Sequence, residues 1–329
     1  SQTVILVTGG AGYIGAHTCK ALARAGYLPV AYDNLVCGHP AAVKWGPLEE
    51  GDVNDRRRLE AVMHQYNPAA VMHFAAFSQV GESMRDPARY YRNNVCHTQV
   101  LLDAMVHAGV DQLVFSSTAA VYGNPVYTPI DELHPTQPIN PYGKTKLVIE
   151  HALKDYHEAY GLRSVSFRYF NACGAHPEAG IGERHDPETH LIPNILKSLL
   201  EGDKPLKVFG NDYSTPDGSC IRDYVHVCDL AEAHLAAASW LDGNDTAGIM
   251  NLGNGDGFSV FEVIRAVERV TGRAVTFEID NRRIGDPPKL VADASLARAA
   301  LDWKPKYGSI DAIVDTAWSF HHKAGPVSG

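Results

Sequence analysis

The chain has 329 residues, of which 45% are hydrophobic and 20% charged, a composition typical of a globular protein with one large or two closely packed domains. Its formal net charge of −9 argues against nucleic acid as a partner, because a polyanion needs a basic surface. No apolar run approaches the ~20 residues of a membrane span and no signal-peptide core opens the sequence, so we expect no membrane partner. The six scattered cysteines contain no CxxC pair, which favours reduced thiols and a cytoplasmic location.

A glycine-rich turn follows the first predicted strand, residues 4–7, and precedes a helical pattern at 17–25. Gly9 permits a tight turn, Gly12 lets the backbone approach a pyrophosphate, and Gly15 allows close packing of helix and strand. The phosphate would lie at the helix N-terminus, where free N–H groups and the helix dipole attract anions. This strand–turn–helix junction is typical of dinucleotide binding.

The second predicted strand, residues 28–32, supports the same interpretation. It ends in Asp33, which lies about 20 residues beyond the glycines, where a carboxylate binds the ribose 2′-hydroxyl. Asn34 and Leu35 follow, and no arginine is placed there to bind a 2′-phosphate. We therefore expect NAD rather than NADP.

Strands and helices continue to alternate along the first half of the chain. The sequence predicts a short strand closing at 51–53, strands at 70–74, 112–115 and 164–169, and helices at 56–66, at 90–108 and from Tyr142 onwards. This order predicts an α/β fold with a Rossmann-like, doubly wound parallel sheet, in which ligands bind at the carboxyl ends of the strands. Five candidate residues fall at such ends: Asp33, Asp52, Ala75, Thr118 and Phe170.

A tyrosine and a lysine four residues apart follow a helix start signal. Asn140 is a good N-cap and Pro141 suits the first helical position, so Tyr142 and Lys146 are expected on one face of a helix. A phenol has a pKa of about 10, but a nearby ammonium and an oxidised nicotinamide both favour the phenolate. The pair therefore indicates removal of a proton from an alcohol while a hydride leaves the same carbon.

The regular alternation of predicted strands and helices ends after about residue 172. A loop-like stretch at 174–190 is followed by predicted helices at 191–200, 229–241 and 258–271, by strands at 221–225 and 249–252, by a turn-rich stretch at 208–219, and by a break at 282–288 before a last helical stretch. We divide the chain into an NAD-binding domain, residues 1–172, and a smaller α/β substrate domain, residues 173–329. The segment from about 229 to 253 is expected to pack back onto the first domain.

Two histidine-containing segments are not expected to bind a metal. His185, Asp186, Glu188 and His190 crowd one loop, but the HExxH pattern is absent and a solvated polar loop accounts for them. The pair at 321–322 is expected to form an exposed tail. We therefore predict no metal site.

Eight motifs run through the chain from Val4 to about Trp318: TGGAGYIG, FAA, SSTAAVYG, NPYGKTK, RYFNACGA, FGNDYSTPDG, IRDYVHV and RRIGDPP. They resemble the extended short-chain dehydrogenase/reductases and, within them, the UDP-glucose 4-epimerase family. The first and fourth motifs indicate only the superfamily, whereas the last three together are more specific. The resemblance implies an isomerase that reversibly inverts carbon 4 of a UDP-sugar, UDP-glucose or UDP-galactose. It further implies a transient 4-keto intermediate, tightly bound NAD and a homodimer.

The resemblance also implies residue roles. Tyr142 is the implied catalytic base, Lys146 holds the nicotinamide ribose and lowers the pKa of the tyrosine, and Thr118 contacts the reacting oxygen of the sugar. The implied cofactor-binding residues are Gly9, Gly12, Tyr13, Ile14, Gly15, Asp33, Asn34, Asp52, Val53, Phe74, Ala75, Ala76, Asn93, Tyr142, Lys146 and Phe170. The implied substrate-binding residues are Thr118, Asn171, Leu191, Arg222, Arg283, Asp286 and Leu290.

Several positions depart from the family pattern. Ser78 replaces a lysine near the cofactor, His190 replaces a nucleotide-binding asparagine, and Leu290 occupies a position of variable size in the sugar pocket. UDP-xylose/UDP-arabinose and UDP-N-acetylglucosamine therefore stay open as alternative substrates. A dehydratase or decarboxylase is disfavoured, because Ala119 and Ala120 stand where those enzymes need acidic residues. A catalytically inactive NAD-binding module is disfavoured because the Tyr/Lys pair is present.

Overall fold

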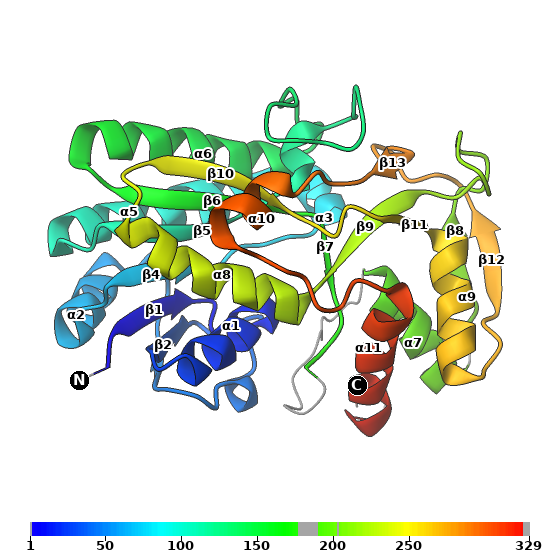
Figure 1. The fold of residues 1–329 in the computed structure, drawn as a ribbon, viewed down its shortest axis with the longest axis horizontal. Coiled ribbons are helices and arrows are strands. Elements are labelled where there is room, and N and C mark those ends of the chain that lie inside the picture. The colour runs from blue at the N-terminus through cyan, green and yellow to red at the C-terminus, as the bar shows by residue number, and fades with distance from the viewer. Residues whose placement is uncertain (1, 177–189, 203, 325–329) are drawn as a thin grey trace.

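A seven-stranded parallel sheet forms the centre of the computed structural model, which describes residues 2–176, 190–202 and 204–324 (Figure 1). The spatial order of its strands is β10-β6-β5-β4-β1-β2-β3. The strands are β1 (Val4–Thr8), β2 (Leu28–Asp33), β3 (Leu48–Glu50), β4 (Ala70–His73), β5 (Gln112–Thr118), β6 (Arg163–Tyr169) and β10 (Ala247–Leu252). Because the chain leaves β1 in one direction for β2 and later returns to its other side for β4, the predicted doubly wound Rossmann-like fold is confirmed.

Helices cover both faces of this sheet (Figure 1). One face packs against α1 (Tyr13–Arg24) and α8 (Val227–Asp242), and the other against α2 (Arg56–Tyr66), α5 (His97–Ala108) and α6 (Pro141–Tyr160). Successive side chains of a strand point to opposite faces, so Ile5 and Val7 join the first layer while Leu6 joins the second. Burial on both faces explains why the central strands β1 and β4 are nearly continuous apolar runs.

The helix that carries Tyr142 begins where the sequence predicts. The Asn140 side chain accepts a hydrogen bond of 2.8 Å from the Gly143 backbone N–H, and Pro141 occupies the first turn. Gly161 ends the helix in the left-handed conformation, with φ 74°. Both ends of α6 are therefore fixed by local chemistry.

Other predicted helices differ from the structure. The predicted helix at 90–108 is divided into α4 (Pro87–Tyr90), a wide π-helical turn (Tyr91–Cys96) and α5, and the short helix α3 (Val80–Arg85) was not predicted. The predicted helix at 258–271 begins at Val260, because Ser259 forms a capping box with Glu262 and residues 257–259 pair as a strand.

Most of the remaining elements form a smaller layer beside the main sheet (Figure 1). They are β7 (Asn171–Cys173), α7 (Leu191–Glu201), β8 (Leu206–Phe209), β9 (Ile221–His226), β11 (Gly257–Ser259), α9 (Val260–Thr271), β12 (Phe277–Asp280), β13 (Lys289–Leu290) and α11 (Ile310–Ala324). Helix α10 (Ser295–Leu301) packs instead against α8 and β10 of the main sheet. Helices α7, α9 and α11 share one apolar core. The predicted exposed tail at 321–322 is part of α11, where His321 is half-buried and His322 is exposed. The ring centroids of His322 and Trp318 lie 4.9 Å apart, with the planes tilted by 31°.

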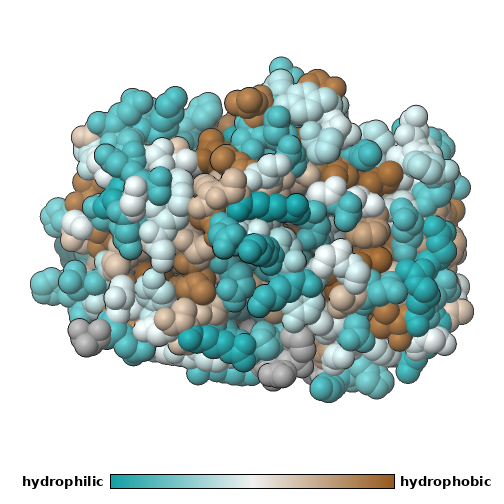
Figure 2. All heavy atoms as spheres, viewed as in Figure 1, coloured by the Kyte–Doolittle hydropathy of each residue, from teal (hydrophilic) through white to brown (hydrophobic). Residues whose placement is uncertain are grey.

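The surface carries scattered apolar groups. On the face shown in Figure 2, hydrophobic residues lie in separate patches among hydrophilic ones, as is usual for folded proteins. Within the described residues, none of the helices combines the length and the apolar character needed to cross a bilayer.

Candidate active site

A cavity of about 1640 Å³ opens at the carboxyl ends of the central strands, bounded on its other side by elements of the smaller layer. Its volume exceeds the about 300–1,000 Å³ of a pocket for one small ligand, so it has room for two ligands in contact. All of the sequence-predicted catalytic, cofactor-binding and substrate-binding residues line it. The structure thus brings together residues from position 9 to position 290.

The glycine-rich turn between β1 and α1 leaves no room for side chains. A Cβ at Gly9, where φ is +70°, would lie 2.8 Å from the Ala75 backbone nitrogen at the end of β4. A Cβ at Gly15 would lie 2.2 Å from the Gly9 carbonyl oxygen, and one at Gly12 would lie 3.2 Å from the same oxygen. The bare backbone therefore lets the N-terminus of α1 face the cavity, which suits a pyrophosphate.

Asp33 lies at the end of β2 with both carboxylate oxygens held by the backbone. One oxygen accepts a 3.0 Å hydrogen bond from the Ala11 N–H and the other a 2.8 Å bond from the Leu35 N–H. Burial raises the pKa of this carboxyl, and these hydrogen bonds oppose the rise. A carboxylate fixed in this way suits ribose hydroxyl groups and repels a 2′-phosphate, so the site favours NAD over NADP.

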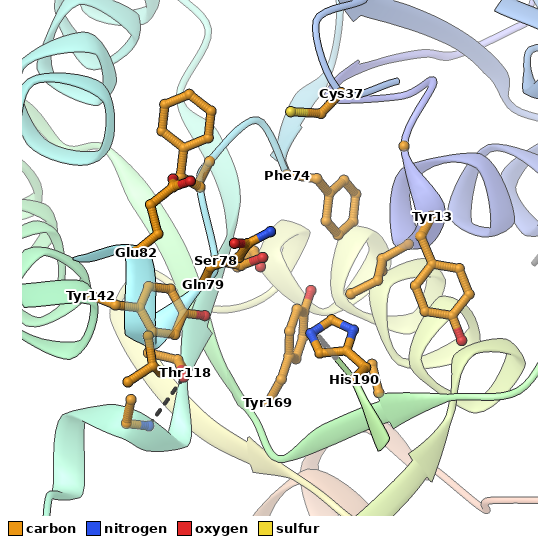
Figure 3. Close-up of a pocket in the computed structure, with 18 of the residues that line it drawn as sticks. Tyr13, Cys37, Phe74, Ser78, Gln79, Glu82, Thr118, Tyr142, Tyr169 and His190 are labelled. Carbon is orange, nitrogen blue, oxygen red and sulfur yellow. Dashed lines mark hydrogen bonds between the residues drawn. The ribbon is translucent and has the colours of Figure 1, made fainter. Parts of the chain in front are cut away.

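Thr118, Tyr142 and Lys146 all line the cavity where β5 ends beside α6, and Figure 3 shows the first two. Tyr142 faces the cavity next to Thr118, and a hydrogen bond from Thr118 lowers the pKa of the phenol while burial, the larger effect, raises it. The Lys146 Nζ donates a 2.8 Å hydrogen bond to the Ser116 carbonyl. Burial lowers the pKa of this amine to about 7, against the opposite effect of Glu150. A proton can therefore be gained or lost here close to neutral pH.

Two arginines share one carboxylate on the opposite side of the cavity. Arg222 on β9 lies 3.8 Å from Asp286, and Arg283 lies 3.7 Å from the other oxygen of the same group. The Arg283 guanidinium also stacks over the Phe209 ring at 4.3 Å. Two positive charges against one negative charge leave a local excess that suits a diphosphate, even though the whole protein is acidic.

The other predicted substrate residues complete this side of the cavity. Asn171 lies on β7, Leu191 opens α7 and Leu290 lies on β13. Leu290 is partly buried and packs against a small apolar cluster that includes Phe170. An aliphatic side chain at this place limits the room near the end of β6.

Sequence reasoning missed several residues of the cavity wall. Tyr169 lies across the cavity from Tyr142 (Figure 3), and its hydroxyl forms a 2.5 Å hydrogen bond with His234. Its place as the last residue of a predicted strand was a usable signal. Phe209 and the residues of α3 carried no such signal, because only strand pairing and helix packing bring them to the cavity.

The described part of the chain contains no group of three or more His, Cys, Asp or Glu residues placed to hold a metal ion. Of the predicted polar loop, His190 lies in the cavity wall. His185, Asp186 and Glu188 lie outside the described residues.

The chain matches a known protein family. Residues 5–253 match the model of the NAD dependent epimerase/dehydratase family. The chain is 51% identical over 319 residues to a UDP-glucose 4-epimerase of Rhizobium meliloti (strain 1021), and the match covers 97% of each chain.

Solved structures agree with this match. The crystal structure of UDP-glucose 4-epimerase from Brucella ovis in complex with NAD has a TM-score of 0.92 and 51% identity, covering 96% of this chain and 97% of that one. The UDP-glucose 4-epimerase from Bifidobacterium longum in complex with NAD+ and UDP has a TM-score of 0.92 and 39% identity, covering 98% of both chains. The glycine turn, the Tyr/Lys pair and these matches over nearly the whole chain lead to one conclusion: the chain belongs to the NAD-dependent epimerase/dehydratase family.

Proposed function

We propose that the protein reversibly inverts carbon 4 of a UDP-sugar, interconverting UDP-glucose and UDP-galactose, with NAD as a tightly bound cofactor. One observation carries the proposal. The Tyr142, Lys146 and Thr118 cluster lies in a single cavity between a dinucleotide-type turn and the pair formed by Arg222 and Arg283. Such a site can hold a dinucleotide and a nucleotide-sugar with their reacting ends at the same tyrosine.

The cofactor side of the cavity fits NAD. The bare glycine turn would hold the pyrophosphate and Asp33 the adenosine ribose, because the first offers backbone N–H groups and the second a fixed carboxylate. Lys146 would hold the nicotinamide ribose, within reach of the end of β5. When bound there, NAD would supply a reversible hydride acceptor for carbon 4, with no net oxidation over the cycle.

Tyr142 takes the proton from the 4-hydroxyl group of the sugar, and Thr118 orients that hydroxyl by hydrogen bonding. Burial alone raises the pKa of Tyr142, so a positive charge is needed to favour the phenolate. The Lys146 ammonium supplies that charge from the next helical turn. The proton returns from the same tyrosine when the 4-keto sugar is reduced.

Inversion requires that the sugar turn over while the nucleotide stays bound. Arg222 and Arg283 reach the cavity from β9 and from the segment before β13, away from Tyr142 on α6. They anchor the diphosphate, so that the 4-keto sugar can present its other face to the same hydride donor. This separation of anchoring and chemistry distinguishes an epimerase from a simple dehydrogenase.

The proposal includes a domain division, an assembly and a location. We assign residues 1–172 to the NAD-binding domain and 173–329 to the UDP-sugar domain, with about 229–253 returning to the first, supported by the pairing of β10 with β6. The six free cysteines support the reducing cytoplasm. Family membership supports a homodimer, which light scattering tests by giving twice the 35.8 kDa chain mass.

The direct test is to incubate the purified protein with UDP-galactose, without added NAD, and to follow the anomeric proton of the sugar by NMR. Appearance of UDP-glucose supports both the epimerisation and the resident cofactor. Parallel incubations with UDP-xylose and UDP-N-acetylglucosamine decide the substrate class: conversion of only one of these moves the assignment to that sugar. If no UDP-sugar changes while NAD is present, the proposal is wrong.

A substitution tests the role of the base. Tyr142→Phe is expected to lower kcat about 10²–10⁴-fold while leaving NAD bound, because the ring keeps its edge contact of 6.5 Å with Tyr90. Tyr160→Phe is the matched control, since Tyr160 lies on the same helix but is 63% exposed. Near-normal turnover of Tyr142→Phe contradicts the assignment.

A further inference from the structure

Two neighbouring residues of β5 are each held by α6, at positions one helical turn apart. The Ser116 carbonyl accepts the hydrogen bond from Lys146, and the Ser117 hydroxyl donates a 2.5 Å hydrogen bond to the Glu150 carboxylate. The next residue, Thr118, makes the contact with the catalytic phenol. The end of β5 is therefore tied to the helix by the amine and by a carboxylate that the proposed chemistry leaves without a role.

The Glu150 carboxylate belongs to a buried, fully connected network. It forms an ion pair with Arg168 on β6, with distances of 2.5 Å and 3.1 Å, and both residues are at most 5% exposed. Arg168 also donates a 3.0 Å hydrogen bond to the Tyr122 hydroxyl, which donates in turn to Asn251. The Asn251 backbone N–H donates a 3.0 Å hydrogen bond to Glu132. Such a network fixes both position and charge, because each charged group is satisfied.

The network lies beside the Lys146 amine, on which burial and Glu150 act in opposite directions. Burial lowers the pKa of Lys146 to about 7, and Glu150 is the group that raises it. Burial lowers the pKa of His73 on β4 to about 3, raises that of Tyr122 to about 12, and raises those of Tyr142 and Tyr169, so these side chains are neutral near pH 7. Arg168 is charged and is paired with Glu150. Glu150, one helical turn from Lys146 and bonded to the neighbouring residue of β5, therefore favours the charged form of the amine.

We propose that Glu150 is a positioning residue for the reaction: fixed by Arg168 and Ser117, its carboxylate keeps Lys146 charged and aligned one helical turn away. Without it, the charged form of Lys146 would be less favoured, and the amine would support the Tyr142 phenolate less. The inference rests on the proposed function for its catalytic consequence, but the charge of the amine is measurable by itself.

The experiment titrates Lys146 in the holoenzyme. Protein labelled with carbon-13 at the lysine Cε is followed by NMR against pH, and the Lys146 resonance is identified by its absence in Lys146→Met protein. Glu150→Gln is expected to lower the pKa of Lys146 by roughly one to two units, the effect of losing one opposite charge at close range. The apparent pKa above which kcat/KM declines is expected to fall by the same amount.

Glu150→Gln leaves Arg168 charged and unpaired, which destabilises a protein strongly. The double variant Glu150→Gln/Arg168→Gln loses the same carboxylate without a buried unpaired charge, and it is expected to lower the pKa of Lys146 as well. Arg168→Gln alone keeps the carboxyl group but removes the charge that favours its ionised form, so it is expected to lower the pKa of Lys146 less than Glu150→Gln does. Glu60→Gln removes the carboxylate of an exposed Arg56 ion pair on α2 and is expected to change nothing.

A purely structural role for the network predicts a different result. In one case, Glu150→Gln and Arg168→Gln both lower stability and leave the pKa of Lys146 unchanged. In the other case, both variants lower that pKa equally. Either outcome overturns the inference. If the pKa shifts as expected but wild-type protein converts no UDP-sugar, the proposed function is wrong and the charge assignment stands.

Discussion

Buried histidines should make the stability of this protein depend steeply on mildly acidic pH, and His234 gives the clearest case. Its ring is fully buried between β6 and α8, where one nitrogen meets the Tyr169 hydroxyl at 2.5 Å and the other meets the Leu230 carbonyl at 2.8 Å. Burial lowers the pKa of His234 to about 4, although the Leu230 carbonyl opposes this. The folded protein therefore holds His234 neutral at pH values where the unfolded chain has taken up a proton.

The magnitude follows from the two pKa values. An unfolded histidine has a pKa of about 6.5, so His234 favours the folded state fully above that pH, and the advantage is lost as the pH falls towards 4. Each pH unit in that window changes the free energy of unfolding by about 1.4 kcal/mol, so that pH 5 costs about 2 kcal/mol for this one residue. Buried carboxyls with raised pKa values, such as those of Asp223 and Asp229, act in the opposite direction.

A comparison of wild type with His234→Gln cancels the contributions of these carboxyls, because both proteins contain them. Urea unfolding of wild type and His234→Gln, each at pH 7 and pH 5, gives the loss of unfolding free energy on acidification for both proteins. We expect this loss to be about 2 kcal/mol smaller in His234→Gln, whatever its stability at pH 7. His64→Gln, at an exposed position of α2, is the control and should leave the loss unchanged. Equal losses in wild type and His234→Gln would refute the reasoning.

Three further predictions concern the cavity. Arg283→Ala should weaken UDP binding about 10–100-fold in calorimetry with NAD content unchanged, since a hydrogen bond to a charged group contributes about 1.5–3 kcal/mol; equal binding by the variant contradicts the diphosphate role. Gly15→Ala should abolish retention of NAD through gel filtration, because its Cβ would lie 2.2 Å from the Gly9 carbonyl, whereas Gly243→Ala, whose Cβ meets nothing closer than 4.0 Å, should retain it. Asn140→Ala should lower the free energy of unfolding by about 1 kcal/mol in urea titrations, because α6 loses its N-cap; an unchanged value would show that the cap contributes little.

The sequence by itself determined those parts of the protein whose physical cause is local. The glycine spacing fixed the turn after β1, the Asn140–Pro141 pair fixed the start of α6, and apolar periodicity fixed α2, which spans the predicted residues 56–66. Because strands of a parallel sheet end at one edge, their order also located the cavity. Spacing placed Tyr142 and Lys146 on one face of α6, but it did not place residues of different elements beside each other.

Only the tertiary structure decided which distant residues meet. The pairing of β10 with β6, the convergence of Arg222 and Arg283 on one carboxylate, and the burial of Glu150 against Arg168 join segments far apart in the chain. The π-helical turn within the predicted helix at 90–108 also makes such contacts, because the Asn94 side chain bonds to the Phe77 backbone and to Thr145 on α6. Burial, strand register and the resulting pKa values depend on every element around a residue, so no local pattern encodes them.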